Sequence, residues 1–161
     1  MKAAELYPAI KMRIVLALGT GLRRGDIESL KITDIDFENN SITTTSKKTK
    51  KSMGNRPVPE SIMNILKVYI NKLSPDQEKL FTKKFNPRQW RKICIAAGLN
   101  DLKFHDLRKI FASVLAQNGV STAVTQRLLE HSSPNLTNKV YTNIDPVLRQ
   151  SVEKLPIQKW L

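Results

Sequence analysis

The sequence is poor in cysteine, in acidic residues and in long apolar runs, and each shortage narrows the class of protein. Cys94 is the one cysteine among 161 residues, which excludes an intramolecular disulfide and favours a small packed residue in a reducing, cytoplasmic compartment. No apolar run is long enough to span a bilayer, and the N-terminus lacks the apolar core of a signal peptide, so we expect no membrane partner.

The shortage of acids leaves a strongly positive chain. Lysine and arginine total 27 against 14 for aspartate and glutamate, a formal net charge of +13, which predicts a polyanionic partner, with nucleic acid as the first candidate. Scattered lysines would fit a merely solvated surface, but clustering favours a phosphate-facing one. We expect two clusters to contact DNA, one with Lys47, Lys50, Lys51 and Arg56 around Lys48, the other with Lys83, Lys84, Arg88 and Arg91.

Periodicity predicts a mainly α domain with a small antiparallel β-sheet, an α+β fold. The β-branched run at 41–46 predicts a strand, with 35–37 as its partner across a turn and 56–59 as a proline-bounded edge strand. Apolar residues at three- and four-residue steps predict helices over 3–18, 24–30, 62–73, 91–97, 107–118, 121–129 and 147–155. Pro8 falls inside the first helix and is also compatible with its first turn.

The segment His-Asp-Leu-Arg at 105–108 is the first candidate for chemistry. His105 and Arg108 stand three residues apart on a predicted helix, so they share a face at the edge of a stripe that contains Leu107 and Ile110. Taken alone, the pair fits a packed histidine and a surface charge better than it fits a site.

Arg23 strengthens the case for a site. It follows a glycine-containing turn and opens a predicted helix, where backbone amides and the helix dipole favour an anion. A guanidinium holds two phosphate oxygens in a fork that lysine lacks, and Asp26 is placed to orient it. The alternative is that Arg23 is an exposed loop charge.

Taken in order, these motifs resemble the catalytic domain of the tyrosine recombinase (phage integrase) family. The resemblance covers residues from about 10 to about 155, nearly the whole chain. The segments that carry it are TGLRRGDIESL at 20–30, KKTK at 47–50, RPVP at 56–59, HDLR at 105–108, LLEHSSP at 128–134 and VYT at 140–142.

The resemblance implies a metal-independent DNA strand transfer without cofactor or ATP. Tyr141 would attack a phosphodiester, forming a 3′-phosphotyrosyl link and releasing a 5′-hydroxyl. Arg23 and Arg108 would bind the non-bridging oxygens, with Asp26 in support. The residues expected to handle protons and hydrogen-bond the phosphoryl group are Lys48 as general acid, His105 as proton carrier from the tyrosine, and His131 as phosphoryl hydrogen-bond donor.

The physical chemistry agrees with this assignment. A phenol of pKa ~10 is a weak nucleophile at neutral pH and needs nearby cations or a base. Two arginines and a lysine supply the positive field that a metal ion provides elsewhere, and the sequence has no carboxylate cluster, no Cys/His metal spacing and no Walker-type glycine loop.

Three details depart from the commonest family pattern. Tyr141 stands one residue further from His131 than the usual spacing, and Glu130 occupies a position where the family most often has glycine. The lysine-rich segment offers several candidates for the general acid: Lys48, directly before Thr49, matches best, with Lys47 and Lys50 as rivals.

The expected organisation is a single catalytic domain over 1–161, without the N-terminal core-binding domain that family members usually carry. The resemblance implies double-stranded DNA as partner, a monomer when isolated and a tetramer in synapsis. We expect a C-terminal tail at about 156–161; the stretch from Leu155, including Trp160 and Leu161, either docks on a neighbouring protomer or packs on its own core.

Two other functions stay open at this point. A type IB topoisomerase shares the chemistry but relaxes supercoiled DNA without sequence preference. A non-catalytic DNA-binding or regulatory domain would not need the candidate active-site residues.

Overall fold

The computed structural model describes residues 2–45, 52–129 and 146–157. After a 3₁₀ turn at Lys2–Ala4, helix α1 (Pro8–Thr20) runs through the centre of the molecule. Pro8 occupies the first turn, where its missing N–H leaves no hydrogen bond unmade, so the second of the two predicted helix starts is confirmed. The helix ends because Gly21 adopts φ 63°, a left-handed conformation that favours glycine, and donates its N–H to the Ala17 carbonyl over 3.0 Å.

The predicted antiparallel sheet is present, with three strands in sequence order. Strand β1 (Ile35–Asp36) pairs with β2 (Ser41–Thr45), which pairs with β3 (Ser52–Pro57). In this register Ile42 faces Arg56 across β2 and β3, on a side of the sheet that is buried. Pro57 ends β3 at the sheet edge, where the missing ladder donor is tolerated.

Six further helices follow or flank the sheet, close to the predicted ranges. They are α2 (Arg24–Ser29), α3 (Glu60–Ile70), α4 (Pro87–Ala96), α5 (Asp106–Gln117), α6 (Thr122–Leu129) and α7 (Pro146–Glu153). Helix α4 begins four residues earlier than predicted because Asn86 caps it, accepting from the Arg88 and Gln89 N–H groups. The predicted cap of α6 by Ser121 is confirmed by a 3.4 Å hydrogen bond from the Val124 N–H.

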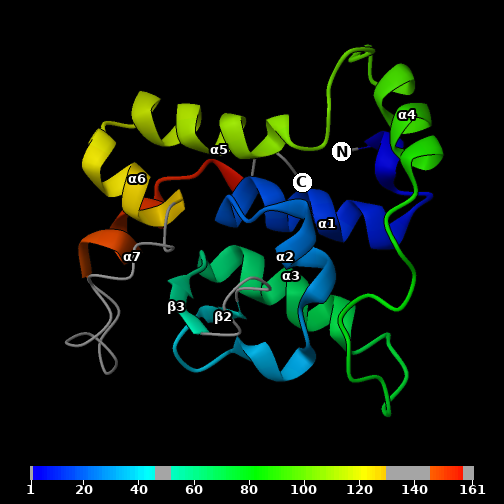
Figure 1. The fold of residues 1–161 in the computed structure, drawn as a ribbon, viewed down its shortest axis with the longest axis horizontal. Coiled ribbons are helices and arrows are strands. Elements are labelled where there is room, and N and C mark those ends of the chain that lie inside the picture. Colours follow the sequence, from blue (N-terminus) through cyan, green and yellow to red (C-terminus); the bar gives the residue numbers. More distant parts are fainter. Residues whose placement is uncertain (1, 46–51, 130–145, 158–161) are drawn as a thin grey trace.

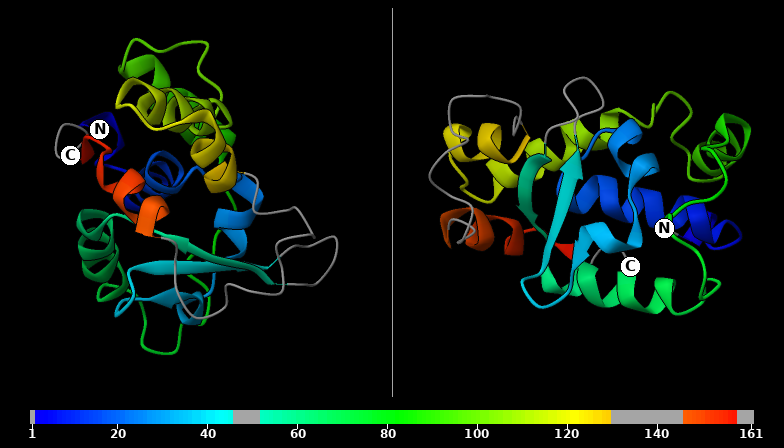
Figure 2. Two further views of the ribbon diagram at one scale, coloured as in Figure 1. Left: turned by 90° about the vertical axis from the view of Figure 1, so that its left-hand side faces the viewer. Right: turned by 60° about the horizontal axis from the view of Figure 1, so that its bottom comes forward.

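The elements form layers around α1. Helices α5 and α6 lie on one side of α1, and the sheet with α3 lies on the other, as Figure 1 and the left-hand view of Figure 2 show. Because α1 packs against α5, α2 and α3, its side chains are buried on nearly all faces, including Ile14, Leu16 and Ala17. The C-terminal end of α1 therefore lies between the side formed by α5 and α6 and the side formed by the sheet and α3.

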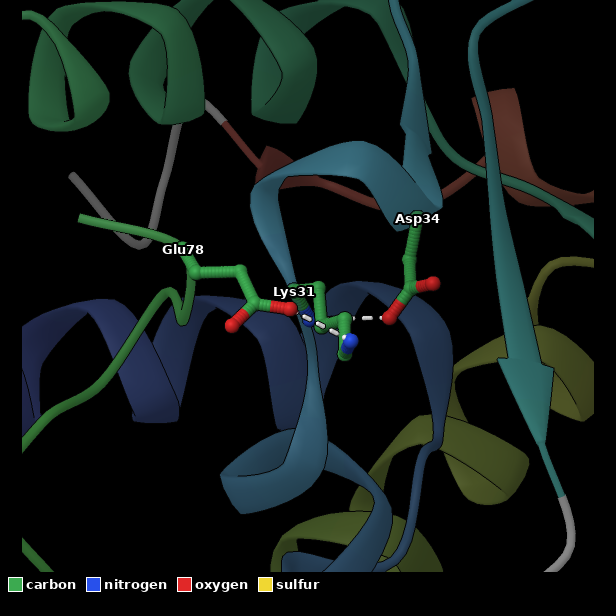
Figure 3. Close-up of polar contacts among 3 residues, drawn as sticks. All are labelled: Lys31, Asp34 and Glu78. Carbon is green, nitrogen blue, oxygen red and sulfur yellow. Dashed lines mark hydrogen bonds and ion pairs between the residues drawn. The ribbon is translucent and has the colours of Figure 1, made fainter. Parts of the chain in front are cut away.

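The segment after α2 is fixed to the segment before residue 80 by backbone pairing and a surface ion pair. The Ile32 N–H donates to the Glu78 carbonyl and the Leu80 N–H to the Leu30 carbonyl, both over 2.9 Å. The Lys31 ammonium lies 2.5 Å from Glu78, and the Lys31 N–H donates to Asp34 (Figure 3). The hydrogen bond from Lys31 lowers the pKa of the Glu78 carboxyl.

Two predicted core residues are exposed, and one predicted tail is partly core. Ile110 is 36% and Val147 51% exposed, because each lies on the outer side of its helix while Leu107 and Leu148 face inward. Leu155 and Ile157 are buried, so the beginning of the C-terminal stretch packs on the core of its own chain. Trp160 and Leu161 lie outside the described residues.

Candidate active site

Arg23 lies at the entry to α2, directly after the turn that ends α1. It is the N-terminal cap residue of that helix, its backbone is extended and its side chain is exposed. Its carbonyl accepts the Asp26 and Ile27 N–H groups, which fixes the first turn of α2. Gly21 and Leu22, which precede it, are buried, so packing holds the backbone next to Arg23 while its guanidinium is exposed.

His105 and Arg108 lie at the start of α5, on the helix where the sequence predicted them; the prediction did not say which turn. His105 is the exposed N-terminal cap residue and makes no side-chain capping bond. Asp106 between them accepts from the Lys103 N–H and from the Lys109 ammonium; these contacts, the Lys109 hydrogen bond first, lower the pKa of its carboxyl.

Arg108 reaches from α5 to the turn that carries Arg23. Its Nη1 donates to the Gly21 carbonyl over 2.5 Å and its Nη2 to the Leu129 carbonyl over 2.6 Å. Arg108 therefore binds the chain at Gly21, two residues before Arg23, although Arg108 and Arg23 are 85 residues apart in sequence (108 minus 23).

Arg56 is corrected by the structure. It was predicted to face phosphate on a basic surface, but it is 2% exposed. Its Nη1 donates to the Thr20 carbonyl over 2.9 Å and also to the Leu128 carbonyl. A guanidinium enclosed in this way does not present its donors to DNA at the surface.

The charges of Arg23, Asp26 and Arg108 act on the buried guanidinium of Arg56. Burial is the main cause that lowers the pKa of Arg56 to about 9, followed by repulsion from Arg108, with Arg23 adding to it and Asp26 opposing it. At neutral pH the Arg56 guanidinium keeps its charge. Arg23, Asp26, Arg56 and Arg108 thus form a cluster with three positive charges and one negative charge.

The second predicted basic cluster is on the surface. Lys83, Lys84, Arg88 and Arg91 are all exposed, on the segment that leads into α4 and on α4 itself. The segment is anchored from below: the Phe85 N–H donates to the Glu28 carboxylate over 3.0 Å, and the Arg24 guanidinium lies over the Phe85 ring.

Arg13 is a buried arginine that sequence reasoning missed. It is 2% exposed, donates to the Ala9 carbonyl over 3.0 Å and to the Lys83 carbonyl over 2.5 Å, and lies 4.0 Å from the centre of the Phe81 ring. The available signal was its position in a helix that is otherwise apolar on several faces, between Met12 and Ile14.

Several predicted site residues lie outside the described residues. They are Lys47, Lys48, Lys50, Lys51, His131 and Tyr141. Among the described residues, no three His, Cys, Asp or Glu side chains are grouped so as to hold a metal ion. No helix in the described part of the chain is long and apolar enough to cross a membrane.

Comparison with known proteins decides what this constellation belongs to. The model of the phage integrase family matches residues 2–146. The chain belongs to the phage integrase family. This confirms the resemblance that the six motifs indicated.

Relatives and solved structures of this family agree with the assignment. The chain is 30% identical to tyrosine recombinase XerA of Pyrococcus furiosus, over 95% of this chain and 58% of the relative. A crystal structure of XerA recombinase superimposes with a TM-score of 0.69 at 25% identity, over 92% of this chain and 58% of that one. The Tn1549 transposon integrase, in complex with circular intermediate DNA, gives 0.63 at 19% identity, over 88% and 56%.

The predicted fold class, mainly α with a small antiparallel sheet, is confirmed as that of an integrase-family domain. The chain spans about half the length of the curated relatives it matches.

Proposed function

We propose that this chain is the catalytic domain of a site-specific DNA recombinase, which cleaves and rejoins DNA strands through a phosphotyrosyl intermediate. The observation that carries the proposal is that Arg108 on α5 binds the carbonyl of Gly21, two residues before Arg23, although the two arginines lie far apart in sequence. Two arginines that approach the same turn would suit the non-bridging oxygens of a single phosphodiester, because each guanidinium can bind two oxygens.

The proposed reaction is a transesterification at phosphorus. The Tyr141 oxygen attacks the phosphorus, the bond to the 5′-oxygen breaks, and a 3′-phosphotyrosyl ester forms. His105 assists removal of the phenol proton, and Lys48 gives a proton to the leaving 5′-oxygen. Bond energy is conserved in the ester, so the reverse attack by a 5′-hydroxyl rejoins a strand without ATP.

The two arginines would act mainly in the transition state. Negative charge grows on the non-bridging oxygens as the nucleophile approaches, and donors fixed before the reaction stabilise that charge most strongly. Asp26 moderates repulsion within the cluster, and His131 is proposed to hydrogen-bond the phosphoryl oxygens. Arg23 fits the role because its helix start is rigid while its guanidinium is exposed.

The DNA surface is proposed to combine this site with the exposed basic residues. Lys83, Lys84, Arg88 and Arg91 would contact the phosphate backbone, as would Lys47, Lys50 and Lys51. The Tn1549 integrase, whose fold this chain shares, was solved in complex with DNA. For this chain we propose a monomer when isolated and a tetramer when two duplexes are synapsed.

Covalent trapping tests the function directly. The protein is mixed, in EDTA, with nicked duplexes from a randomised pool, and an SDS-stable protein–DNA adduct is sought. We expect an adduct that peptide mapping places on Tyr141 and that is absent in Tyr141→Phe.

Other outcomes separate the alternatives. Binding to DNA without any adduct would contradict a catalytic role and favour a DNA-binding domain. Relaxation of a supercoiled plasmid without preferred adduct sites would favour topoisomerase-like activity. An adduct that needed a divalent ion would contradict the metal-independent mechanism.

A further inference from the structure

Arg56 is a buried arginine whose partners are backbone carbonyls. It donates to Thr20, the last residue of α1, and to Leu128 near the end of α6. Arg108 makes the same kind of link one residue further along both segments, to Gly21 and Leu129. Two guanidiniums therefore join the end of α1 to the end of α6 in consecutive steps.

The two links fix the turn from which Arg23 projects. Thr20 is 1% exposed, its hydroxyl donates to the Leu16 carbonyl over 2.6 Å and accepts the Leu22 N–H over 3.2 Å. With Arg56 and Arg108 bound to the carbonyls of Thr20 and Gly21, this turn has little freedom to shift. Its geometry then sets where the backbone of Arg23 lies relative to Arg108.

Stability alone does not account for a charged residue at this position. Among the described residues no carboxylate lies within ion-pair distance of Arg56, and its Nε has no hydrogen-bond partner there. A buried charge without a counter-ion is costly, and a neutral donor would satisfy two carbonyls with less desolvation. The cost is offset if an anion binds next to the cluster, because Arg56 adds to the positive potential that attracts it.

We propose that Arg56 is a positioning residue for strand cleavage, which holds the Arg23 turn against α6 so that Arg23 and Arg108 meet the same phosphate. This inference rests on the proposed function for its catalytic readout. The link from Arg56 to Thr20 and Leu128 can be tested by amide exchange, which needs no catalytic activity. It replaces direct DNA contact as the role of Arg56.

The test compares Arg56→Met, Arg56→Lys and Arg13→Met. Arg13 is a matched control, since it is equally buried, also donates to two carbonyls and also has an unpartnered Nε among the described residues, but its links run to Ala9 and Lys83. All variants are studied at a temperature at which circular dichroism shows them folded. Three quantities are measured: the single-turnover adduct rate at saturating nicked DNA, the salt dependence of affinity for a fluorescein-labelled duplex, and amide exchange by mass spectrometry.

We expect Arg56→Met to lower the adduct rate by about 100-fold, the scale for losing one preorganised donor, with affinity and its salt dependence preserved. Arg56→Lys should recover part of the rate because it keeps the charge and N–H donors. Arg13→Met should leave the rate unchanged. An unchanged rate in Arg56→Met, or an equal loss in Arg13→Met, would overturn the proposal.

Two further readouts keep the result decisive. If Arg56 touched DNA, Arg56→Met would reduce the slope of log affinity against log salt by about 0.9, and the proposal would be wrong. If the wild type forms no adduct, the proposed function fails. Amide exchange then tests by itself whether Arg56 holds the Arg23 turn against α6. Faster exchange at residues 20–23 and 126–129 in Arg56→Met, but not in Arg13→Met, supports it; unchanged exchange there refutes it.

Discussion

Two groups of basic residues in this protein carry the same charge in opposite environments. Arg56 and Arg108 reach into the junction between α1 and α6, where their guanidiniums bind carbonyls. The residues around the start of α4, among them Lys83 and Arg88, are exposed. The environments differ: Arg56 is buried and Arg108 half-buried, and both are held by carbonyls, whereas the residues around the start of α4 are exposed and their charges are screened by salt.

The comparison separates two contributions to a reaction on DNA. In the proposed reaction the exposed group would contribute affinity for DNA that depends on ionic strength and not on base sequence. Arg56 and Arg108 would contribute geometry, on which we propose that the rate depends once DNA is bound. Substitutions in the two groups should therefore change different measurements.

The largest expected effect comes from Arg108→Lys, which keeps the charge of the junction but removes the fork. A lysine cannot bridge Gly21 and Leu129 and also hold two phosphate oxygens. We expect the adduct rate at saturating DNA to fall by about 10³-fold, with DNA affinity nearly unchanged. A loss of DNA affinity with an unchanged rate would show that Arg108 contributes to binding, as proposed for the exposed residues around the start of α4.

Gly21→Ala changes the shape of the junction without touching any charge. An added Cβ would lie 2.6 Å from the Phe111 ring and 2.9 Å from the Leu129 side chain, at φ 63°. We expect a loss of about 2–3 kcal/mol in the free energy of unfolding, measured by urea denaturation.

Gly119→Ala is the control for that substitution. Gly119 also has positive φ, 75°, but an added Cβ would meet nothing within 4 Å. Its cost should be about 1 kcal/mol, from the backbone alone. Equal costs for the two variants would mean that packing at the junction is loose.

Lys83→Gln combined with Lys84→Gln tests the exposed group. Each lysine that contacts a phosphate should take about 0.9 from the slope of log affinity against log salt. The adduct rate at saturating DNA should stay the same. Lys67→Gln, at an exposed position on α3 outside both clusters, is the control and should change neither. A changed rate with an unchanged slope would reverse the assignment of the two groups.

The smallest effect is expected from Glu78→Gln. The ion pair with Lys31 is exposed, so solvent and salt screen it, and the adjoining backbone bonds at Ile32 and Leu80 persist without it. The melting temperature should hardly change. A large drop in melting temperature would show that the Lys31–Glu78 ion pair contributes strongly to stability in spite of its exposure.

Local patterns predicted the elements well because each element carries its own signals. Pro8 and Gly21 mark the two ends of α1, and Asn118 and Gly119 mark the end of α5. The start of α4 was missed although Asn86-Pro87 is a cap followed by proline, a combination that predicts a helix start. The predicted position of Arg23 at a helix start, and of His105 and Arg108 on one helix, follows from the same local signals.

The place of Arg56 depended on register, which the sequence does not state. Arg56 faces buried Ile42 across the sheet, and a shift of one residue would turn it to the other face. Its acceptors, Thr20 and Leu128, are 36 and 72 residues away and offer backbone rather than side chains. No residue type in the sequence marks them, so charge alone suggested a surface position.

That the acceptors of Arg56 are carbonyls has a consequence for how the protein tolerates change. A side-chain partner can be altered together with its mate, so that a second substitution repairs the first. The Thr20 and Leu128 carbonyls are present whatever amino acid occupies those positions, and their demand for a donor does not change with sequence. In a pairwise mutational scan, loss of Arg56 should therefore find no suppressor at position 20 or 128, and its position should count among the least replaceable in the chain.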